Sequence, residues 1–164
     1  MTPRLRGDLS RRTFLGSGTA GALGGLSALG ALALPGSVEA ADLSDKEKAN
    51  VAVVNEFCAA WKSGDAAKAG TCLADNCTVR FLASTEGNAP VNGKAAVVEQ
   101  IAKYLSGMKI EFVISETFAK GPIVVNRRVD KLVSATGPRD IQIVGVFFVT
   151  KGKIREWHDF AADV

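Results

Sequence analysis

Three ionisable residues, Arg128, Asp130 and Asp159, stand at positions where two strands could bring them together. Arg128 and Asp130 are two positions apart, and side chains two apart on a strand point to the same face. Apolar residues flank this pair, so burying its charges is costly unless each charge meets a partner. If Asp159 faces the same cavity, one arginine lies between two carboxylates, which cannot both ionise cheaply. One carboxyl group can then hold a proton at neutral pH, which is the outline of an acid–base site.

Two strands must position these residues. The first is predicted at 123–134, because Val and Ile crowd this segment and a Gly-Pro turn precedes it. The second is the last strand, predicted at 153–161, which carries Asp159. A simpler interpretation of Arg128 and Asp130 is a structural ion pair, because such pairs occur in strands without any catalytic role.

The predicted elements place helices first and strands last, which is an α+β order. A capping box of Ser44 and Glu47 begins the first helix. Helices are expected at 44–63, 65–73 and 93–105, and strands at 78–82, 110–119, 123–134, 139–150 and 153–161. Short turns join the last four strands into an antiparallel meander. We therefore expect an α+β fold in which a cone-like, curved antiparallel sheet and three N-terminal helices enclose a pocket. Gly145, inside a strand, predicts a bend or bulge.

Residues 1–40 are expected to be an export signal rather than part of the fold. Residues 10–15, Ser-Arg-Arg-Thr-Phe-Leu, match a twin-arginine motif, a mildly apolar run extends to residue 34, and small residues at 38–40 suit cleavage. The alternative is a membrane anchor, but the run is shorter than the roughly 20 residues that a comfortable span needs. We divide the chain into a signal peptide, residues 1–40, and one domain, residues 41–164, which is exported to the periplasm or secreted.

Charge and composition limit the kinds of partner expected for the mature chain. The whole chain has a formal net charge of +3, and removal of the leader brings the mature charge near +1. No basic run with interleaved aromatic residues remains, so nucleic acid is not an expected partner. No mature segment is apolar enough to cross a bilayer. The chain has three cysteines, Cys58, Cys72 and Cys77. They could form a single disulfide or remain free, buried thiols. No spacing of His or Cys residues predicts a metal site.

Four segments of the domain carry a resemblance to a known family. They are Arg-Val-Asp at 128–130, Ile-Val-Gly-Val-Phe at 143–147, Thr-Lys-Gly-Lys-Ile at 150–154 and Trp-His-Asp at 157–159. Together they resemble limonene-1,2-epoxide hydrolase, within the nuclear-transport-factor-2-like (SnoaL-like) superfamily. The resemblance covers residues 44–161. Its specific part is the Arg-x-Asp strand followed by the Trp-x-Asp strand, because the fold itself is shared by enzymes and non-enzymes.

The resemblance implies one-step addition of water to a small hydrophobic epoxide, without metal or cofactor. Asp130 would be the general acid, Asp159 the general base, and Arg128 the bridge between the two carboxylates. A homodimer is the expected assembly. The residues expected to line the substrate pocket are Leu132, Ile141, Ile143, Trp157 and Tyr104.

One departure from the family keeps other functions open. The family holds the attacking water with a Tyr and an Asn, two apart on the first strand, where this sequence has Val79 and Phe81. Neither side chain can hydrogen-bond a water. Thr78 or Arg80 could replace them if the register shifts by one residue, and Tyr104 on the third helix could supply a hydroxyl. The alternatives are a non-hydrolytic protein of the same fold, which binds a ligand or acts as an isomerase or polyketide cyclase, and an interaction module with a closed pocket.

Overall fold

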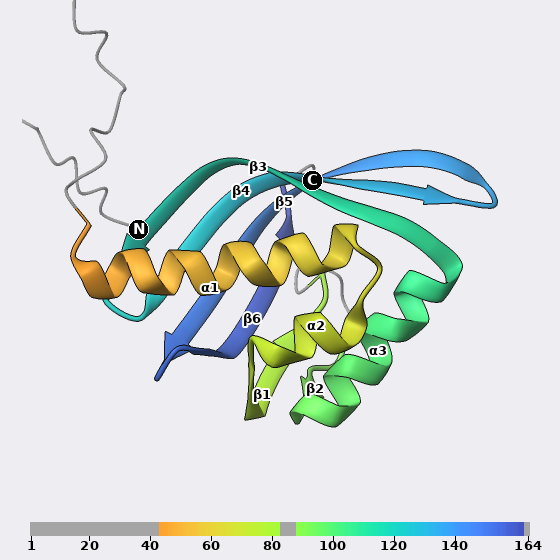
Figure 1. Cartoon of the computed structure of the whole chain (residues 1–164). Coiled ribbons are helices and arrows are strands. Elements are labelled where there is room, and N and C mark those ends of the chain that lie inside the picture. Colours follow the sequence, from red (N-terminus) through yellow and green to blue (C-terminus); the bar gives the residue numbers. More distant parts are fainter. Residues whose placement is uncertain (1–42, 83–87, 163–164) are drawn as a thin grey trace, which may run out of the picture. The chain divides into compact units, whose positions relative to one another are not determined.

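The computed structural model describes residues 43–82 and 88–162 (Figure 1), so the predicted signal peptide lies outside the described residues. Helices and strands follow the predicted order. The helices are α1 (Asp45–Lys62), α2 (Ala66–Thr71) and α3 (Lys94–Gly107), and the strands are β1 (Leu73–Arg80), β2 (Val91–Asn92), β3 (Met108–Lys120), β4 (Ile123–Ser134), β5 (Gly137–Thr150) and β6 (Lys153–Ala161). Within these residues no helix is long and apolar enough to cross a membrane.

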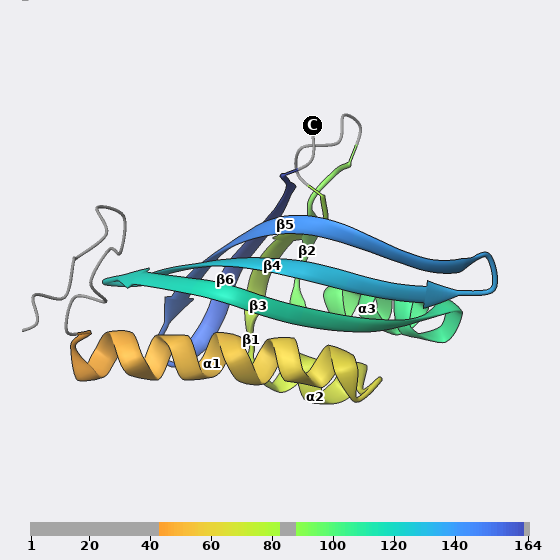
Figure 2. The ribbon, with the colours of Figure 1, turned by 90° about the horizontal axis from the view of Figure 1, so that it is seen from above.

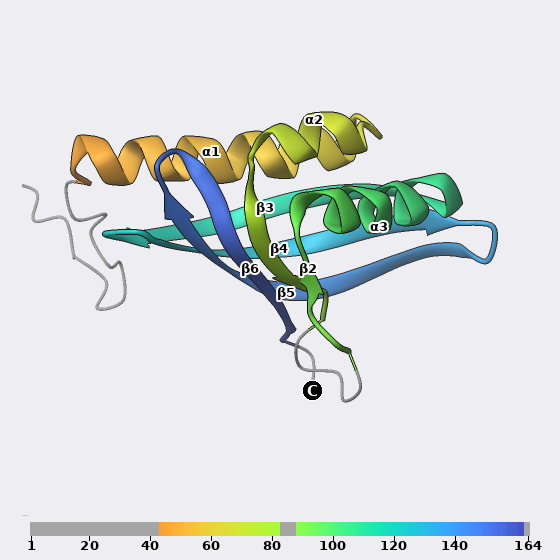
Figure 3. The same cartoon turned by 90° about the horizontal axis from the view of Figure 1, so that it is seen from below.

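All six strands belong to one curved sheet, in the order β2-β1-β6-β5-β4-β3. Figures 2 and 3 show the three helices on the same face of this sheet, with α1 lying along β3. The predicted α+β architecture is confirmed, but the prediction of a purely antiparallel sheet is wrong in one respect. The strand β1 pairs with β6 in parallel, and all other neighbouring strands are antiparallel. This pairing joins strands far apart in the sequence, which no local turn signal can predict.

The predicted capping box begins α1. The Ser44 hydroxyl accepts a hydrogen bond from the Glu47 backbone N–H at 3.3 Å, and the Glu47 carboxylate accepts one from the Ser44 backbone N–H at 2.9 Å. Val54, Phe57 and Trp61 then recur at helical spacing and are buried against the sheet. These residues form the apolar stripe through which α1 packs on the sheet.

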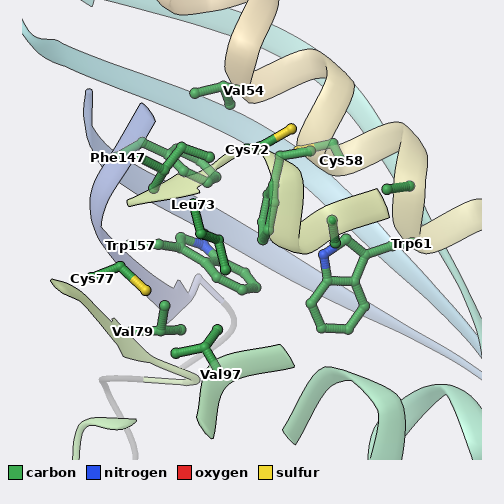
Figure 4. Close-up of a cluster of buried hydrophobic side chains, with 14 of the residues drawn as sticks. Val54, Cys58, Trp61, Cys72, Leu73, Cys77, Val79, Val97, Phe147 and Trp157 are labelled. Carbon is green, nitrogen blue, oxygen red and sulfur yellow. The ribbon is translucent and has the colours of Figure 1, made fainter. Parts of the chain in front are cut away.

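The core lies between the helices and the sheet face that they cover. Figure 4 shows Val54 and Trp61 from α1 with Phe147 and Trp157 from the sheet. The Phe57 ring packs edge-on against Trp157, with ring centroids 4.9 Å apart. Edge-to-face aromatic pairs of this kind stabilise a core beyond the area that they bury.

The three cysteines Cys58, Cys72 and Cys77 are free and buried, so no disulfide forms among them. Burial raises the pKa of the Cys58 thiol to about 12, which keeps it protonated beside the sheet. Within residues 43–82 and 88–162, no three His, Cys, Asp or Glu side chains are grouped to hold a metal ion.

Glu47 ties the start of α1 to the turn between β3 and β4. Its second carboxylate oxygen accepts a hydrogen bond from the Gly121 backbone N–H at 2.8 Å. This bond and those from Ser44 lower the pKa of Glu47 to about 2. A depressed carboxyl pKa stabilises the fold above the ordinary value of 4.5, and that contribution disappears as the pH falls toward 2.

We expect Glu47→Gln to lower the free energy of unfolding most above pH 4.5, with a difference from wild type that shrinks at lower pH. Chemical unfolding measured across this range checks the prediction. Glu56→Gln, an exposed change on the same helix, is the matched control. A pH-independent difference between Glu47→Gln and wild type would contradict the assigned linkage.

Candidate functional site

The polar residues of the site share the sheet face that the helices cover. Asn126 of β4 pairs in register with Gly145 of β5, which pairs in turn with Asp159 of β6. Arg128 and Asp130 follow Asn126 at intervals of two, so their side chains point the same way. Alternation along each strand predicted the shared face, and the register between the strands brings the residues close together.

Arg128 lies between the two carboxylates and binds both. Its Nε donates to Asp130 Oδ1 at 2.7 Å, and its Nη2 donates to Asp159 Oδ2, also at 2.7 Å. A longer contact of 3.4 Å joins Nη2 to Asp130 Oδ2. The Arg128 side chain is fully buried, whereas those of Asp130 and Asp159 keep 12% and 7% of their surface exposed. The structure therefore brings together the three residues that the sequence singled out.

Two further contacts fix the guanidinium of Arg128. Its Nη1 donates to Asn126 Oδ1 at 3.0 Å, and its Cζ lies 4.3 Å from the centroid of the Phe112 ring. The amide nitrogen of Asn126 in turn contacts Cys58 Sγ on α1 at 3.8 Å, which links the helix to the site. A cation over an aromatic face is stabilised by the quadrupole of the ring. No sequence signal points to Phe112, because its position opposite Asp130 depends on the register of β3 with β4.

Gly145 leaves open the space that the guanidinium occupies. A Cβ at this position would overlap Arg128 Nη1 and lie 2.8 Å from Asn126 Oδ1. Of the predicted bend or bulge, the bulge is absent, because the pairing of Gly145 is in register on both sides. The glycine also allows a close approach of side chains. The register shifts of β3 and β5 lie elsewhere, between Ile114 and Glu116 and between Phe148 and Val149.

Trp157 is a hydrogen-bond partner of the site as well as a core residue. Its Nε1 donates to Asp159 Oδ1 at 2.6 Å. Both oxygens of Asp159 therefore accept a short hydrogen bond, one from the indole and one from Arg128. From the sequence, Trp157 is expected only to line the substrate pocket. The spacing of two between Trp157 and Asp159 is the signal that could have indicated the contact, because it puts both side chains on one face.

Burial raises the pKa of both carboxyl groups. For Asp130 the pKa rises to about 6, because desolvation outweighs the opposing charge and hydrogen bonds of Arg128. Burial also raises the pKa of Asp159, and Arg128 and Trp157 oppose the rise. Although burial alone lowers the pKa of Arg128, the nearby charges of Asp159 and Asp130 raise it above its ordinary value, so the guanidinium stays charged.

The two carboxyl groups differ in their hydrogen bonds. Asp159 accepts hydrogen bonds of 2.7 and 2.6 Å on its two oxygens, which favour its ionised form and oppose the effect of burial. Asp130 has one short bond, and its Oδ2 meets the guanidinium only at 3.4 Å. Because both interact with the same guanidinium, the two carboxyl groups titrate as a coupled pair.

The residues predicted to line a substrate pocket lie on the same side of the sheet as the carboxyl groups. Ile143 and Trp157 are each 1% exposed and belong to the core. Leu132, Ile141 and Tyr104 are half-buried, and Leu132 and Tyr104 pack against that core. The carboxyl groups are therefore surrounded by apolar side chains. Direct contact of these residues with a substrate stays a prediction.

A family model described as the SnoaL-like domain matches residues 54–157, which is more than half of the chain. The matched segment includes Arg128 and Asp130 and ends two residues before Asp159. No curated protein sequence gives a match.

Several solved structures share the fold. An LEH-like epoxide hydrolase from M. tuberculosis is 21% identical, covers 70% of this chain and 84% of its own, and has a TM-score of 0.64. A candidate SnoaL-like polyketide cyclase from Jannaschia sp. CCS1 is 19% identical, with 74% and 90% coverage and a TM-score of 0.64. An NTF2-like protein of unknown function from Mesorhizobium loti is 19% identical, with 73% and 95% coverage and a TM-score of 0.61. These similarities confirm the predicted nuclear-transport-factor-2-like fold.

Proposed function

This chain belongs to the SnoaL-like domain family, and from that premise we propose that it is a cofactor-independent epoxide hydrolase for a small hydrophobic epoxide. The observation that carries the proposal is the buried guanidinium of Arg128 between Asp130 and Asp159, with 2.7 Å contacts to both. A structural ion pair requires one acid. A second acid on another strand, held in a different hydrogen-bonding environment, supplies the acid and the base that water addition needs.

The proposed reaction is one concerted step. Asp130 gives its proton to the epoxide oxygen while a water oxygen attacks a ring carbon and the ring C–O bond breaks. Asp159 takes a proton from that water, so the product is a diol that has gained one molecule of water. The pair is reset when Asp159 loses its proton and Asp130 regains one through solvent. Acid–base assistance of this kind contributes roughly 10²–10⁴-fold for each group.

The rate is expected to fall as the pH rises above about 6, because Asp130 then loses the proton that it must donate. The rate is also expected to fall at lower pH, where Asp159 becomes protonated and cannot act as the base. The profile of kcat/KM against pH, measured from about pH 4 to 9, checks both limbs. A rate that stays constant up to the alkaline end would contradict Asp130 as the acid.

Incubation with a panel of small apolar epoxides tests the proposed activity. The expected result is formation of a vicinal diol from at least one member, faster than in buffer alone. The panel should contain both cyclic terpene epoxides and linear alkene epoxides of similar carbon number. The apolar side chains around the carboxyl groups predict a hydrophobic substrate but do not predict its shape. Absence of diol from every member would contradict the proposal.

The second candidate is a non-hydrolytic protein that binds an apolar ligand or acts as an isomerase or cyclase. The residues at positions 79 and 81 favour this second candidate. Val79 is fully buried and Phe81 packs on Trp157, and since both side chains are apolar, neither can hold a water beside Asp159. The similarity to a candidate polyketide cyclase is compatible with this function. Tight binding of a terpene or steroid without diol formation would decide for this candidate.

We also propose that residues 1–40 are a twin-arginine signal peptide and that the domain acts outside the cytoplasm. Replacement of both Arg11 and Arg12 by Lys is expected to retain the uncleaved precursor in the cytoplasm. Cell fractionation followed by mass determination of the chain measures this. Replacement of Arg4 and Arg6 by Lys removes the same number of arginines outside the motif and should leave export intact. Equal export of the two double variants would contradict the assignment.

The homodimer that the sequence predicts stays a prediction. Apolar side chains remain exposed on the sheet, among them Phe148 at 38% and Phe160 at 41%. Their exposure is compatible with an interface between two copies, and contiguous apolar surface on a sheet is a common site of association.

A further inference from the structure

Trp61, on α1, carries a buried hydrogen-bond donor that nothing in the described residues satisfies. The side chain is only 3% exposed, and its Nε1 has no hydrogen-bond partner among residues 43–82 and 88–162. The large majority of buried polar groups in proteins are hydrogen-bonded, and a buried N–H without an acceptor destabilises the fold. The aromatic faces around it are only weak acceptors. An unpaired indole N–H in this position indicates an acceptor that arrives with a ligand.

The Trp61 ring packs against two aromatic residues that contact the carboxylate site. Its centroid is 5.1 Å from that of Phe112, whose ring also lies against the Arg128 guanidinium. Its centroid is 5.7 Å from that of Trp157, which donates to Asp159. Figure 4 shows the Trp61 nitrogen on the edge of the indole that faces Trp157. The unpaired donor is therefore one ring away from both ends of the site.

We propose that Trp61 Nε1 donates a hydrogen bond to the oxygen atom of the bound substrate, an inference that rests on the proposed hydrolase function. An indole nitrogen can only donate, so Trp61 cannot serve as a base or accept a proton from water. An epoxide oxygen has two lone pairs. One accepts the proton of Asp130, and the other accepts the Trp61 N–H.

This contact would contribute at two stages. In the bound state it selects an apolar molecule with one oxygen acceptor over a hydrocarbon of the same shape, because only the oxygen satisfies the buried N–H. As the ring C–O bond breaks, negative charge grows on the oxygen, and a preorganised donor stabilises it in surroundings from which water is excluded. Trp61 would then favour substrates that carry an oxygen acceptor and would assist Asp130 by stabilising the charge on that oxygen. Trp61 itself would transfer no proton.

The proposal can be tested on binding alone, because the chain has only two tryptophans, Trp61 and Trp157. Protein labelled with ¹⁵N in the indole ring gives two indole N–H signals, which Trp61→Phe assigns. The probes are menthone, a cyclic ketone, and p-menthane, the same skeleton without oxygen. Menthone is expected to move the Trp61 indole proton downfield, whereas p-menthane should leave it near its position in the free protein.

A second measurement separates the hydrogen bond from the shape of the ring. Benzothienylalanine in place of Trp61 exchanges the N–H for sulfur and keeps the bicyclic shape. It is expected to weaken menthone binding about fivefold to tenfold and to leave the affinity for p-menthane unchanged. An equal loss of affinity for menthone and p-menthane would show that Trp61 contributes only packing and no hydrogen bond.

The outcomes distinguish this inference from the hydrolase proposal. If menthone binds without moving the Trp61 signal, the inference fails and the hydrolase proposal remains. If the Trp61 signal responds but no epoxide is hydrolysed, the donor is confirmed and the hydrolase proposal fails. If neither probe binds, both the donor and the apolar substrate are refuted.

Discussion

Asp130→Asn and Asp159→Asn are each expected to lower the rate of diol formation by at least about 10²-fold while the domain stays folded. Asparagine keeps the size of the side chain but can neither donate a carboxylic proton nor take one from water. Both variants retain a hydrogen-bond acceptor for Arg128, so its guanidinium does not lose its partners. The rate should be measured at saturating epoxide, together with the melting temperature of each variant.

Asp140→Asn is the matched control for both substitutions, since this aspartate is exposed on the neighbouring strand β5. It should leave the rate unchanged. Because Asp130 and Asp159 act in the same step, the double variant should lose less than the product of the two single losses. Wild-type turnover in either single variant would remove that residue from the mechanism.

Gly145→Ala is expected to lower the rate about 10²-fold, although Gly145 takes no part in the proposed chemistry. The added methyl group would overlap Arg128 Nη1 and crowd Asn126. Short hydrogen bonds to the two carboxylates hold the guanidinium in place, so it cannot retreat without lengthening one of them. A shift of about 1 Å in a positioning group is enough for a loss of this size. Overpacking should also lower the free energy of unfolding by about 1–3 kcal/mol.

Gly107→Ala is the matched control, because nothing lies within 4 Å of a Cβ at the end of α3. It should change neither the rate nor, beyond a small gain, the stability. The kinetic loss in Gly145→Ala should appear at saturating substrate, as expected for a displaced catalytic group. A Gly145→Ala enzyme with wild-type rate and stability would show that the close approach at Gly145 does not constrain the site.

The sequence predicted the strands β4 and β6 with the boundaries that the structure has, and alternation along β4 placed Arg128 and Asp130 on one face. That Asp159 faces the same way was only a condition of the predicted site, and the register of the strands meets it. A tight turn precedes each of these strands, and β4 is rich in β-branched residues, so the local pattern and the fold agree. The same holds for the start of α1, where capping-box hydrogen bonds form between residues three apart. Site residues on such segments can be predicted from sequence.

Features that depend on pairing between distant segments were missed. The strand β1 begins at Leu73 rather than at residue 78, although its first residues, Leu-Ala-Asp-Asn, are poor strand formers. Leu73 is held there by pairing with Ile154 on β6, a partner that only the folded sheet supplies. The close approach at Gly145 was missed for the same reason, since the arginine that lies against this glycine comes from another strand. The hydrogen bond of Trp157 to Asp159 is different, because spacing alone could have suggested it.

A single turnover in H₂¹⁸O tests the central claim most directly. Enzyme in excess over an epoxide that it converts is mixed with substrate in labelled water, and the first diol formed is analysed by mass spectrometry. If Asp159 activates water for direct attack, that diol carries one ¹⁸O atom and the protein carries none. Unlabelled diol in the first turnover, with one ¹⁸O atom in a side-chain carboxylate of the protein, would show that an aspartate attacks the ring, and the Arg128, Asp130 and Asp159 mechanism would be contradicted.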